Sequence, residues 1–268
     1  MAELWSRGTL GLESRDEAEQ VVLTAYFGRD RLRSEAWSPG ARRVGGLAVE
    51  VVSIEDVPER DWIAEYRSSA APFALGAGFW VEPGEAGTAS SRTLPRGRRL
   101  LRLPARRAFG TGSHESSRLV VEILESLPVS GKRVLDVGAG SGLLSFVAVH
   151  LGAASVTSVE CDWAAALVAR ENQRLNRIGF ALFAGTVDAL AEQPRFDLAA
   201  VNVIPERIAA DLAGIERCLQ PGSLAVFSGC LARRARRYQN ELERNGFRVV
   251  ESRDQGEWRA LLAEVARR

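Results

Sequence analysis

The stretch RVLDVGAGSGLL, residues 133–144, constrains the fold more than any other part of the chain. An apolar, β-branched run ends in Asp136, and Gly138, Gly140 and Gly142 then lead into a helical pattern. Small residues let a ligand approach the backbone, and a helix N-terminus directs N–H groups toward it. A strand, a glycine-rich turn and a helix in this order therefore predict a concavity of nucleotide size.

The spacing of the glycines separates two classes of cofactor site. A dinucleotide-binding turn, G-x-G-x-x-G/A, needs a small residue where this chain has Leu143. The spacing D-x-G-x-G-x-G instead looks like the S-adenosylmethionine (SAM) loop of the large methyltransferase class. A purely structural glycine turn stays open as the alternative at this point.

Composition limits the class of protein. A chain of 268 residues accommodates one domain plus a smaller one, and an apolar fraction of 46% can build a core. No window has the ~18 uninterrupted apolar residues of a membrane helix, and the first residues lack the pattern of a signal peptide. The three cysteines form neither a disulfide framework nor a metal site: Cys161, Cys218 and Cys230. We therefore expect a cytoplasmic protein without a membrane contact or a metal.

The charge balance argues against a nucleic-acid binder. The net charge is +1, and Lys132 is the only lysine among 35 basic residues. This bias suggests a general preference for arginine, so the arginine-rich segments 96–107 and 233–237 are interpreted as solvated faces rather than binding patches. No direct nucleic-acid binding is predicted.

Residues 1–57 are expected to form a small α/β domain. Residues 21–27 and 47–54 are rich in β-formers and predict two strands. Ser14 followed by Glu17 imitates a capping box, so a short helix there stays open. Because two strands cannot bury a core alone, this piece must lean on the rest of the protein, a partner or a second copy.

A connecting segment, residues 58–98, is expected before the main domain at 99–268. It carries a helical pattern from Glu59 to Ser69, a short apolar run at 79–81, and a Pro-, Gly-, Ser- and Thr-rich linker from residue 82 to 97. From residue 100 onward strands and helices alternate, which is typical of a parallel sheet wound on both faces.

The main domain is predicted to hold seven strands, with the last one antiparallel. The strands fall at 133–137, 155–160, 181–184, 196–202, 224–228, 247–252 and 258–265. Helices are expected at 143–151, 163–176, 206–219 and 233–245, the last ending at the C-cap glycine Gly246. The short link between the last two strands makes a hairpin, so one antiparallel strand enters the sheet. This ending fits a Rossmann-like class I methyltransferase better than a dinucleotide-binding fold.

Three strand ends deliver polar residues to the edge where ligands bind in such sheets. Asp136 and the glycines end the first strand, Glu160 ends the second, and Asn202 ends the fourth. A carboxylate at Glu160 can accept both ribose hydroxyls; a surface acid is the alternative. The Asn202 amide can hold a target amino group, and a turn-initiating Asn is the alternative there.

Methyl transfer from SAM is an in-line displacement that needs alignment and a neutral nucleophile rather than a covalent catalyst. A lysine ammonium has no lone pair, so a lysine target must first lose a proton. The absence of a catalytic triad therefore agrees with this chemistry. Of the two histidines, His150 is expected at a helix end, and His114 is given no proton-transfer role.

An upstream loop, AFGTGSHESS at residues 108–117, precedes a predicted helix. Its small residues suit a segment that lies over the methionine end of the cofactor. A plain helix-capping turn explains the same residues equally well.

With this loop, the chain resembles the PrmA-type ribosomal protein methyltransferases, which modify amino groups of the large-subunit protein L-eleven. The family pattern AFGTGxHxTT, then VLDxGxGSGxL, an acid ending the second strand and an N-I-L-type turn matches residues 108–117, 134–143, 160 and 202–204. The resemblance covers roughly residues 55–268. By position it assigns cofactor contacts to Ser117, Gly138, Glu160 and Asn202, and we expect Asn202 to be the catalytic residue. Further cofactor contacts are expected from the residues of the two loops: Phe109, Thr111, Asp136, Gly140 and Gly142.

The chain departs from the family pattern at several positions. The usual Asp-Pro-Gly is replaced by Pro104 to Arg107, Thr-Thr becomes Ser116-Ser117, and the strand-two Asp becomes Glu160. The resemblance implies a ferredoxin-like N-terminal domain, which we expect to be shortened in this chain. The resemblance implies a SAM-dependent N-methyltransferase of protein amino groups, with a ribosomal protein as substrate. The alternatives are another protein, a nucleic acid or a small amine as substrate, or a SAM-binding module without catalysis.

Overall fold

The computed structural model describes residues 11–17, 20–28, 39–44, 47–56, 71–83, 94–104, 110–190 and 196–266. The chain divides into two compact units, residues 1–60 and 61–268. No helix in these ranges is long and apolar enough to cross a membrane.

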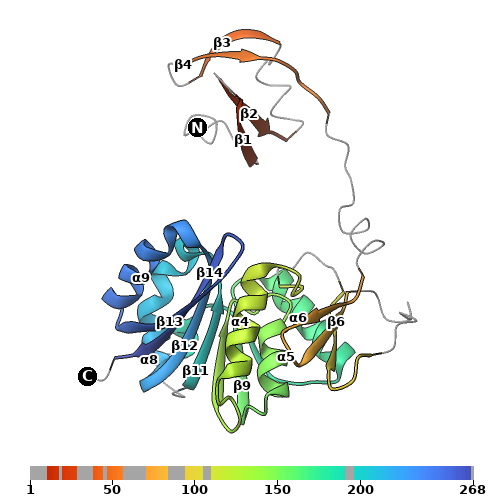
Figure 1. Ribbon diagram of the computed structural model, residues 1–268, viewed down its shortest axis with the longest axis vertical. Helices are drawn as coiled ribbons and strands as arrows, with labels where there is room; N and C mark the ends of the chain where they lie inside the picture. The colour runs from red at the N-terminus through yellow and green to blue at the C-terminus, as the bar shows by residue number, and fades with distance from the viewer. Residues whose placement is uncertain are drawn as a thin grey trace. The chain divides into compact units, whose positions relative to one another are not determined.

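The described part of the first unit consists of two antiparallel hairpins (Figure 1). Strand β1, Gly11–Glu17, pairs with β2, Gln20–Tyr26, and β3, Gly40–Val44, pairs with β4, Leu47–Val51. Both predicted strands are confirmed. The alternative helix at Ser14 is wrong, because Ser14 pairs with Leu23 across the hairpin and cross-strand bonds satisfy the backbone that a helix cap would serve.

The second unit begins with a three-stranded sheet, β5-β6-β7. It comprises β5, Phe73–Leu75, β6, Phe79–Glu82, and β7, Arg99–Arg102. Its buried side chains belong to the same apolar cluster as the helices of the main domain: Leu75, Phe79, Val81, Leu101 and Leu103. Part of the segment expected to connect two domains therefore contributes to the core. The helix expected at 59–69 lies outside the described residues, as does most of the linker at 82–97.

The main sheet has seven strands in the order β10-β9-β8-β11-β12-β14-β13. The parallel strands are β8, Arg133–Val137, β9, Ser155–Glu160, β10, Ala181–Ala184, β11, Phe196–Asn202, and β12, Leu219–Leu231. The hairpin of β13, Phe247–Gln255, and β14, Trp258–Val265, adds the antiparallel strand β14 against β12. The predicted seven-stranded sheet with an antiparallel last strand is confirmed.

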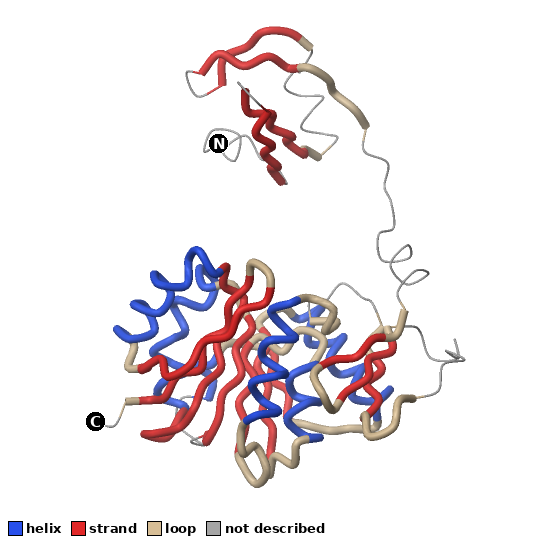
Figure 2. The backbone as a smooth tube through the Cα atoms, in the orientation of Figure 1, coloured by secondary structure: helices blue, strands red, loops and turns tan. Residues whose placement is uncertain are grey.

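Helices lie on both faces of this sheet, as the blue helices beside the red strands show (Figure 2). One face carries α4, Glu115–Ser126, α5, Leu143–His150, and α6, Trp163–Asn176. The other carries α7, Pro205–Ile208, α8, Leu212–Cys218, and α9, Ala235–Arg244. Strand residues alternate between the two apolar layers, so Val134 packs with the first group and Leu135 with the second.

Several predicted boundaries differ in detail: the strand expected at 247–252 runs to Gln255, and a 3₁₀ turn, Ala232–Arg234, precedes the helix expected at 233–245. Two larger differences have a clear physical reason. The single helix expected at 206–219 is divided by a 3₁₀ turn at Ala209–Asp211, a tightening that keeps Ile208 and Leu212 buried on the same side. The strand expected at 224–228 extends from residue 219 to 231, because a bulge opposite Phe196 and Leu198 accommodates Pro221-Gly222 inside the strand.

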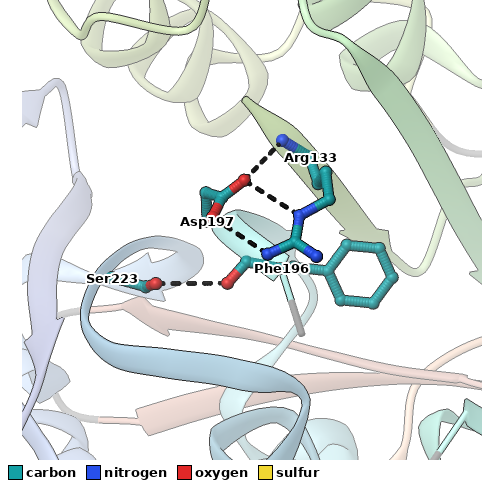
Figure 3. A network of polar contacts seen from close by, with 4 residues as sticks. All are labelled: Arg133, Phe196, Asp197 and Ser223. Atoms are coloured by element: carbon teal, nitrogen blue, oxygen red, sulfur yellow. Dashed lines mark hydrogen bonds and ion pairs between the residues drawn. The ribbon is translucent and has the colours of Figure 1, made fainter. Parts of the chain in front are cut away.

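Side chains fasten the strands at the amino edge of the sheet (Figure 3). The Asp197 carboxylate on β11 accepts the backbone N–H of Arg133 at 2.9 Å and two guanidinium N–H groups at 3.2 Å. The hydrogen bonds from Arg133 lower the pKa of Asp197. Ser223 donates its hydroxyl to the Phe196 carbonyl at 3.1 Å and so ties the bulge to β11. These contacts lie at the edge opposite the predicted site, whose loops join the carboxyl ends of the strands.

Candidate active site

The glycine loop joins β8 to α5 and has a backbone that only glycine adopts easily. Gly138, Gly140 and Gly142 have φ values of 75°, 53° and 85°. A Cβ atom at Gly138 would lie 2.4 Å from Val203, and one at Gly142 would lie 3.0 Å from the Phe180 ring. Gly142 is also the N-cap of α5, with no side-chain capping bond, so the helix presents its first N–H groups to the loop.

Asp136 lies beneath this loop and not at its surface. Its side chain is 1% exposed, and one oxygen accepts the Ser145 hydroxyl at 2.6 Å, which in turn contacts the Ser158 hydroxyl at 2.6 Å. Burial raises the pKa of Asp136 to about 6, while the hydrogen bond from Ser145 opposes this rise. The Asp136 carboxyl therefore links the end of β8 to Ser145 on α5 and Ser158 on β9, beneath the glycine loop.

Glu160, the last residue of β9, is fastened directly to the glycine loop. One carboxylate oxygen accepts the Gly140 N–H at 2.8 Å, and the other accepts the Asp162 N–H at 2.9 Å. The residue is 8% exposed. Each oxygen keeps a second lone pair, so the carboxylate can still accept bonds from a vicinal diol. The alternative of a free surface acid is wrong for this residue.

Asn202, the last residue of β11, faces the start of α4. Its Nδ2 donates to the Ser117 hydroxyl at 3.1 Å, while its buried Oδ1 has no partner among the described residues. Ser228 stands beside Asn202 on β12 and donates to the Ser116 carbonyl at 3.1 Å. The side chain thus bonds across 85 residues, while its buried Oδ1 keeps an unused acceptor at the edge of the sheet.

The upstream loop meets the glycine loop and also caps a helix. The Ser141 hydroxyl donates to the Gly110 carbonyl at 2.6 Å, and Thr111 lies beside Ser113 with its hydroxyl 3.0 Å away. His114 is the N-cap of α4, and its Nδ1 accepts the Ser116 N–H at 3.2 Å. The capping interpretation is therefore confirmed, and it coexists with contact to the glycine loop. Phe109 lies outside the described residues.

Trp258 lies at the edge of the site, and the sequence predicts it only as the first residue of the last strand. Its ring lies 4.6 Å from the His114 ring in an edge-to-face arrangement, and it pairs with Leu231 at the end of β12. Since β14 is antiparallel, its first residue lies at the carboxyl edge of the parallel strands. A bulky aromatic at the start of that strand was the available signal.

The predicted residues thus come together at one edge. Glu160, the glycines and Asn202 follow three neighbouring strands, β9, β8 and β11, and Ser117 joins them from α4. Within the described ranges no group of three or more His, Cys, Asp or Glu residues is arranged to hold a metal ion. Fold and loop chemistry together define a SAM-dependent methyltransferase.

Comparison with known proteins narrows this class. A family described as "Ribosomal protein L11 methyltransferase (PrmA)" matches residues 5–266, so the chain belongs to that family. A ribosomal protein L11 methyltransferase of Synechococcus elongatus is 32% identical, covering 96% of this chain and 89% of the relative. One from Deinococcus radiodurans is 33% identical, covering 97% and 92%.

Two solved structures show the same fold. The ribosomal protein L11 methylase of Lactobacillus delbrueckii subsp. bulgaricus has a TM-score of 0.65 at 24% identity, covering 73% of this chain and 99% of that one. The T. thermophilus 16S rRNA N2 G1207 methyltransferase, in complex with AdoMet and guanosine, has a TM-score of 0.51 at 26% identity and covers 61% of this chain and 46% of that one.

Proposed function

We propose that this methyltransferase transfers methyl groups from SAM to amino groups of a ribosomal protein of the L11 type, in the cytoplasm. The observation that carries the proposal is the convergence of Glu160, the glycine loop and Asn202 at one edge of the sheet. Membership of the L11 methyltransferase family supports the substrate class.

Several features of the loop suit SAM. The glycines supply the positive φ values of a tight turn that packs closely on Val203 and Phe180, and Glu160 keeps lone pairs for ribose hydroxyls. We assign ribose binding to Glu160 and the methionine moiety to Gly138, Gly140 and Gly142. Ser117, Thr111 and Phe109 are assigned to further cofactor contacts, and Asp136 supports the loop from beneath.

Asn202 is the proposed positioning group for methyl transfer. Its unpartnered Oδ1 can accept an N–H from the target amine and so direct the nitrogen lone pair. Bound SAM supplies an electrophilic methyl group on a sulfonium. With SAM bound, Asn202 would hold the acceptor nitrogen in line with the methyl group, so that the N–C bond would form as the C–S bond breaks.

The acceptor amine must be neutral when it reacts. A lysine amine has a pKa of ~10.4 in water, and transfer into a site of low polarity lowers it. The His114 ring packs edge-to-face on Trp258 and contacts the Ser116 hydroxyl, one residue before the Ser117 that bonds Asn202. We assign these two rings to the exclusion of water from the bound amine. The displaced proton passes to solvent, so the chain needs no dedicated base.

Two measurements test the proposal. Calorimetry with SAM should give binding to the wild type and a strongly weakened affinity in Glu160→Ala. Incubation with methyl-labelled SAM and a cell extract, followed by fractionation, should place the label in a ribosomal protein. Label in RNA or small molecules would overturn the substrate class, and binding without any transfer would overturn the catalytic role.

A further inference from the structure

The inner face of α6 packs against the glycine loop with small side chains. Ala165, Ala166 and Ala169 are buried there, and a Cβ atom at Gly142 would lie 3.6 Å from the Ala169 Cβ. A polar residue, Asn172, continues the same buried face and is 0% exposed. A fully buried amide in an alanine-lined contact calls for a specific partner.

That partner is the backbone of the glycine loop. Asn172 Nδ2 donates to the Ser141 carbonyl at 2.9 Å, in a fully buried bond. The preceding residue of the loop, Gly140, has its N–H held by Glu160. Neighbouring backbone groups of the loop are thus fixed from two directions, by the residue that ends β9 and by the helix that follows it.

One turn further along α6, Asn176 holds the strand that leads to the upstream loop. Its Oδ1 accepts the Arg102 N–H at 2.8 Å and its Nδ2 donates to the Arg102 carbonyl at 2.8 Å, as a neighbouring strand would. Nδ2 also bonds the Asn172 carbonyl at 2.9 Å. Downstream, the Gly110 carbonyl accepts the Ser141 hydroxyl at 2.6 Å.

We infer that Asn172 is a positioning residue for the cofactor, which fixes the glycine loop in its binding conformation and, with Asn176 and Ser141, holds the two loops of the site in register. This inference rests on the proposed use of the glycine loop for SAM. Asn172 itself touches no reacting atom. Its contribution lies in the preorganisation of the backbone that surrounds the ligand.

The test compares two amides that are adjacent on α6. Gln173 Nε2 donates to the Phe180 carbonyl at 2.9 Å and not to the backbone of the glycine loop, which Phe180 approaches through its ring, at Gly142. Gln173→Ala is therefore the matched control for Asn172→Ala. SAM affinity is measured by calorimetry, unfolding by thermal melts, and transfer by steady-state kinetics. Asn172→Ala should raise the SAM Kd about tenfold, the effect of one buried hydrogen bond, with a smaller change in kcat at saturating SAM. Gln173→Ala should leave the Kd within about twofold.

The outcomes separate this inference from the proposed function. Failure of the wild type to bind SAM would overturn both. Binding by the wild type with an unchanged Kd in Asn172→Ala, or an equal loss in Gln173→Ala, would overturn only the positioning role. If Asn172→Ala does not fold, Asn172→Ser keeps a short polar side chain, and the same rise in Kd is required of it.

Discussion

Replacement of the buried Asp136 by Asn is expected to stabilise this protein at neutral pH. The side chain is 1% exposed, and burial raises its pKa from 3.8 to about 6. This difference corresponds to ~3 kcal/mol by which the ionised carboxylate destabilises the folded state. An Asn side chain carries no charge, and its Oδ1 can still accept the Ser145 hydroxyl.

The sign of the pH dependence follows from the direction of the shift. Between pH 3.8 and about 6 the folded protein binds a proton that the unfolded chain releases, so the stability of the wild type falls as the pH rises through this window. Above about pH 6 the ionised carboxylate destabilises the folded state by the full amount. Asp136→Asn should therefore exceed the wild type by ~1–3 kcal/mol at about pH 7.5 and approach it near the acid end of the window.

Urea unfolding across that pH range measures the effect. Asp197→Asn is the control with the opposite sign, because hydrogen bonds from Arg133 lower the pKa of Asp197. That substitution should destabilise the protein at neutral pH and lose its effect as the pH falls below the ordinary pKa of aspartate. An Asp136→Asn variant that is less stable than the wild type at neutral pH, or a difference that does not change with pH, would refute the reasoning.

Three further substitutions have distinct expected results. Glu160→Gln should raise the SAM Kd by ~10- to 100-fold in calorimetry, since Gly140 and Asp162 both offer N–H donors and an amide has one acceptor atom; unchanged affinity would contradict this. Arg177 has a φ of 55°, so Arg177→Gly should raise the unfolding free energy in urea by ~0.5–1 kcal/mol, and a decrease would count against it. Trp258→Ala should lower kcat/KM for the protein substrate at least ~tenfold in methyl-transfer kinetics with little change in SAM affinity; parallel losses would argue for a general structural role.

Residues that follow strands were the easiest to predict. In a parallel sheet the carboxyl ends meet at one edge, so the positions of Glu160 and Asn202 at strand ends already imply proximity. The glycine spacing also identified the loop, because backbone with a positive φ favours glycine and the requirement is therefore visible in the sequence.

Residues that act from a helix face or from an antiparallel strand were harder to predict from the sequence. Asn172 lies among several polar residues of α6, where the sequence does not tell a buried amide from an exposed one, and its partner is a backbone carbonyl without a sequence signature. Trp258 reaches the site only because β14 runs opposite to its neighbours. The bulge that lengthens β12 depends on pairing with β11, which local propensity does not encode.

Leu143, which follows the last glycine of the glycine loop, packs against the upstream loop, a contact that neither motif predicts. Its bulk excludes the close packing that a dinucleotide-binding turn requires at this position. In the structure Leu143 is 2% exposed, and a Cβ atom at Gly112 would lie 3.4 Å from its side chain. Gly112 has a φ of 87°, and a Cβ atom there would also lie 3.3 Å from Leu75, so backbone conformation and close packing both favour glycine where the upstream loop contacts Leu143. With the Ser141–Gly110 hydrogen bond, this contact makes the two loops one packed unit, so a change in either is expected to alter the binding surface of both.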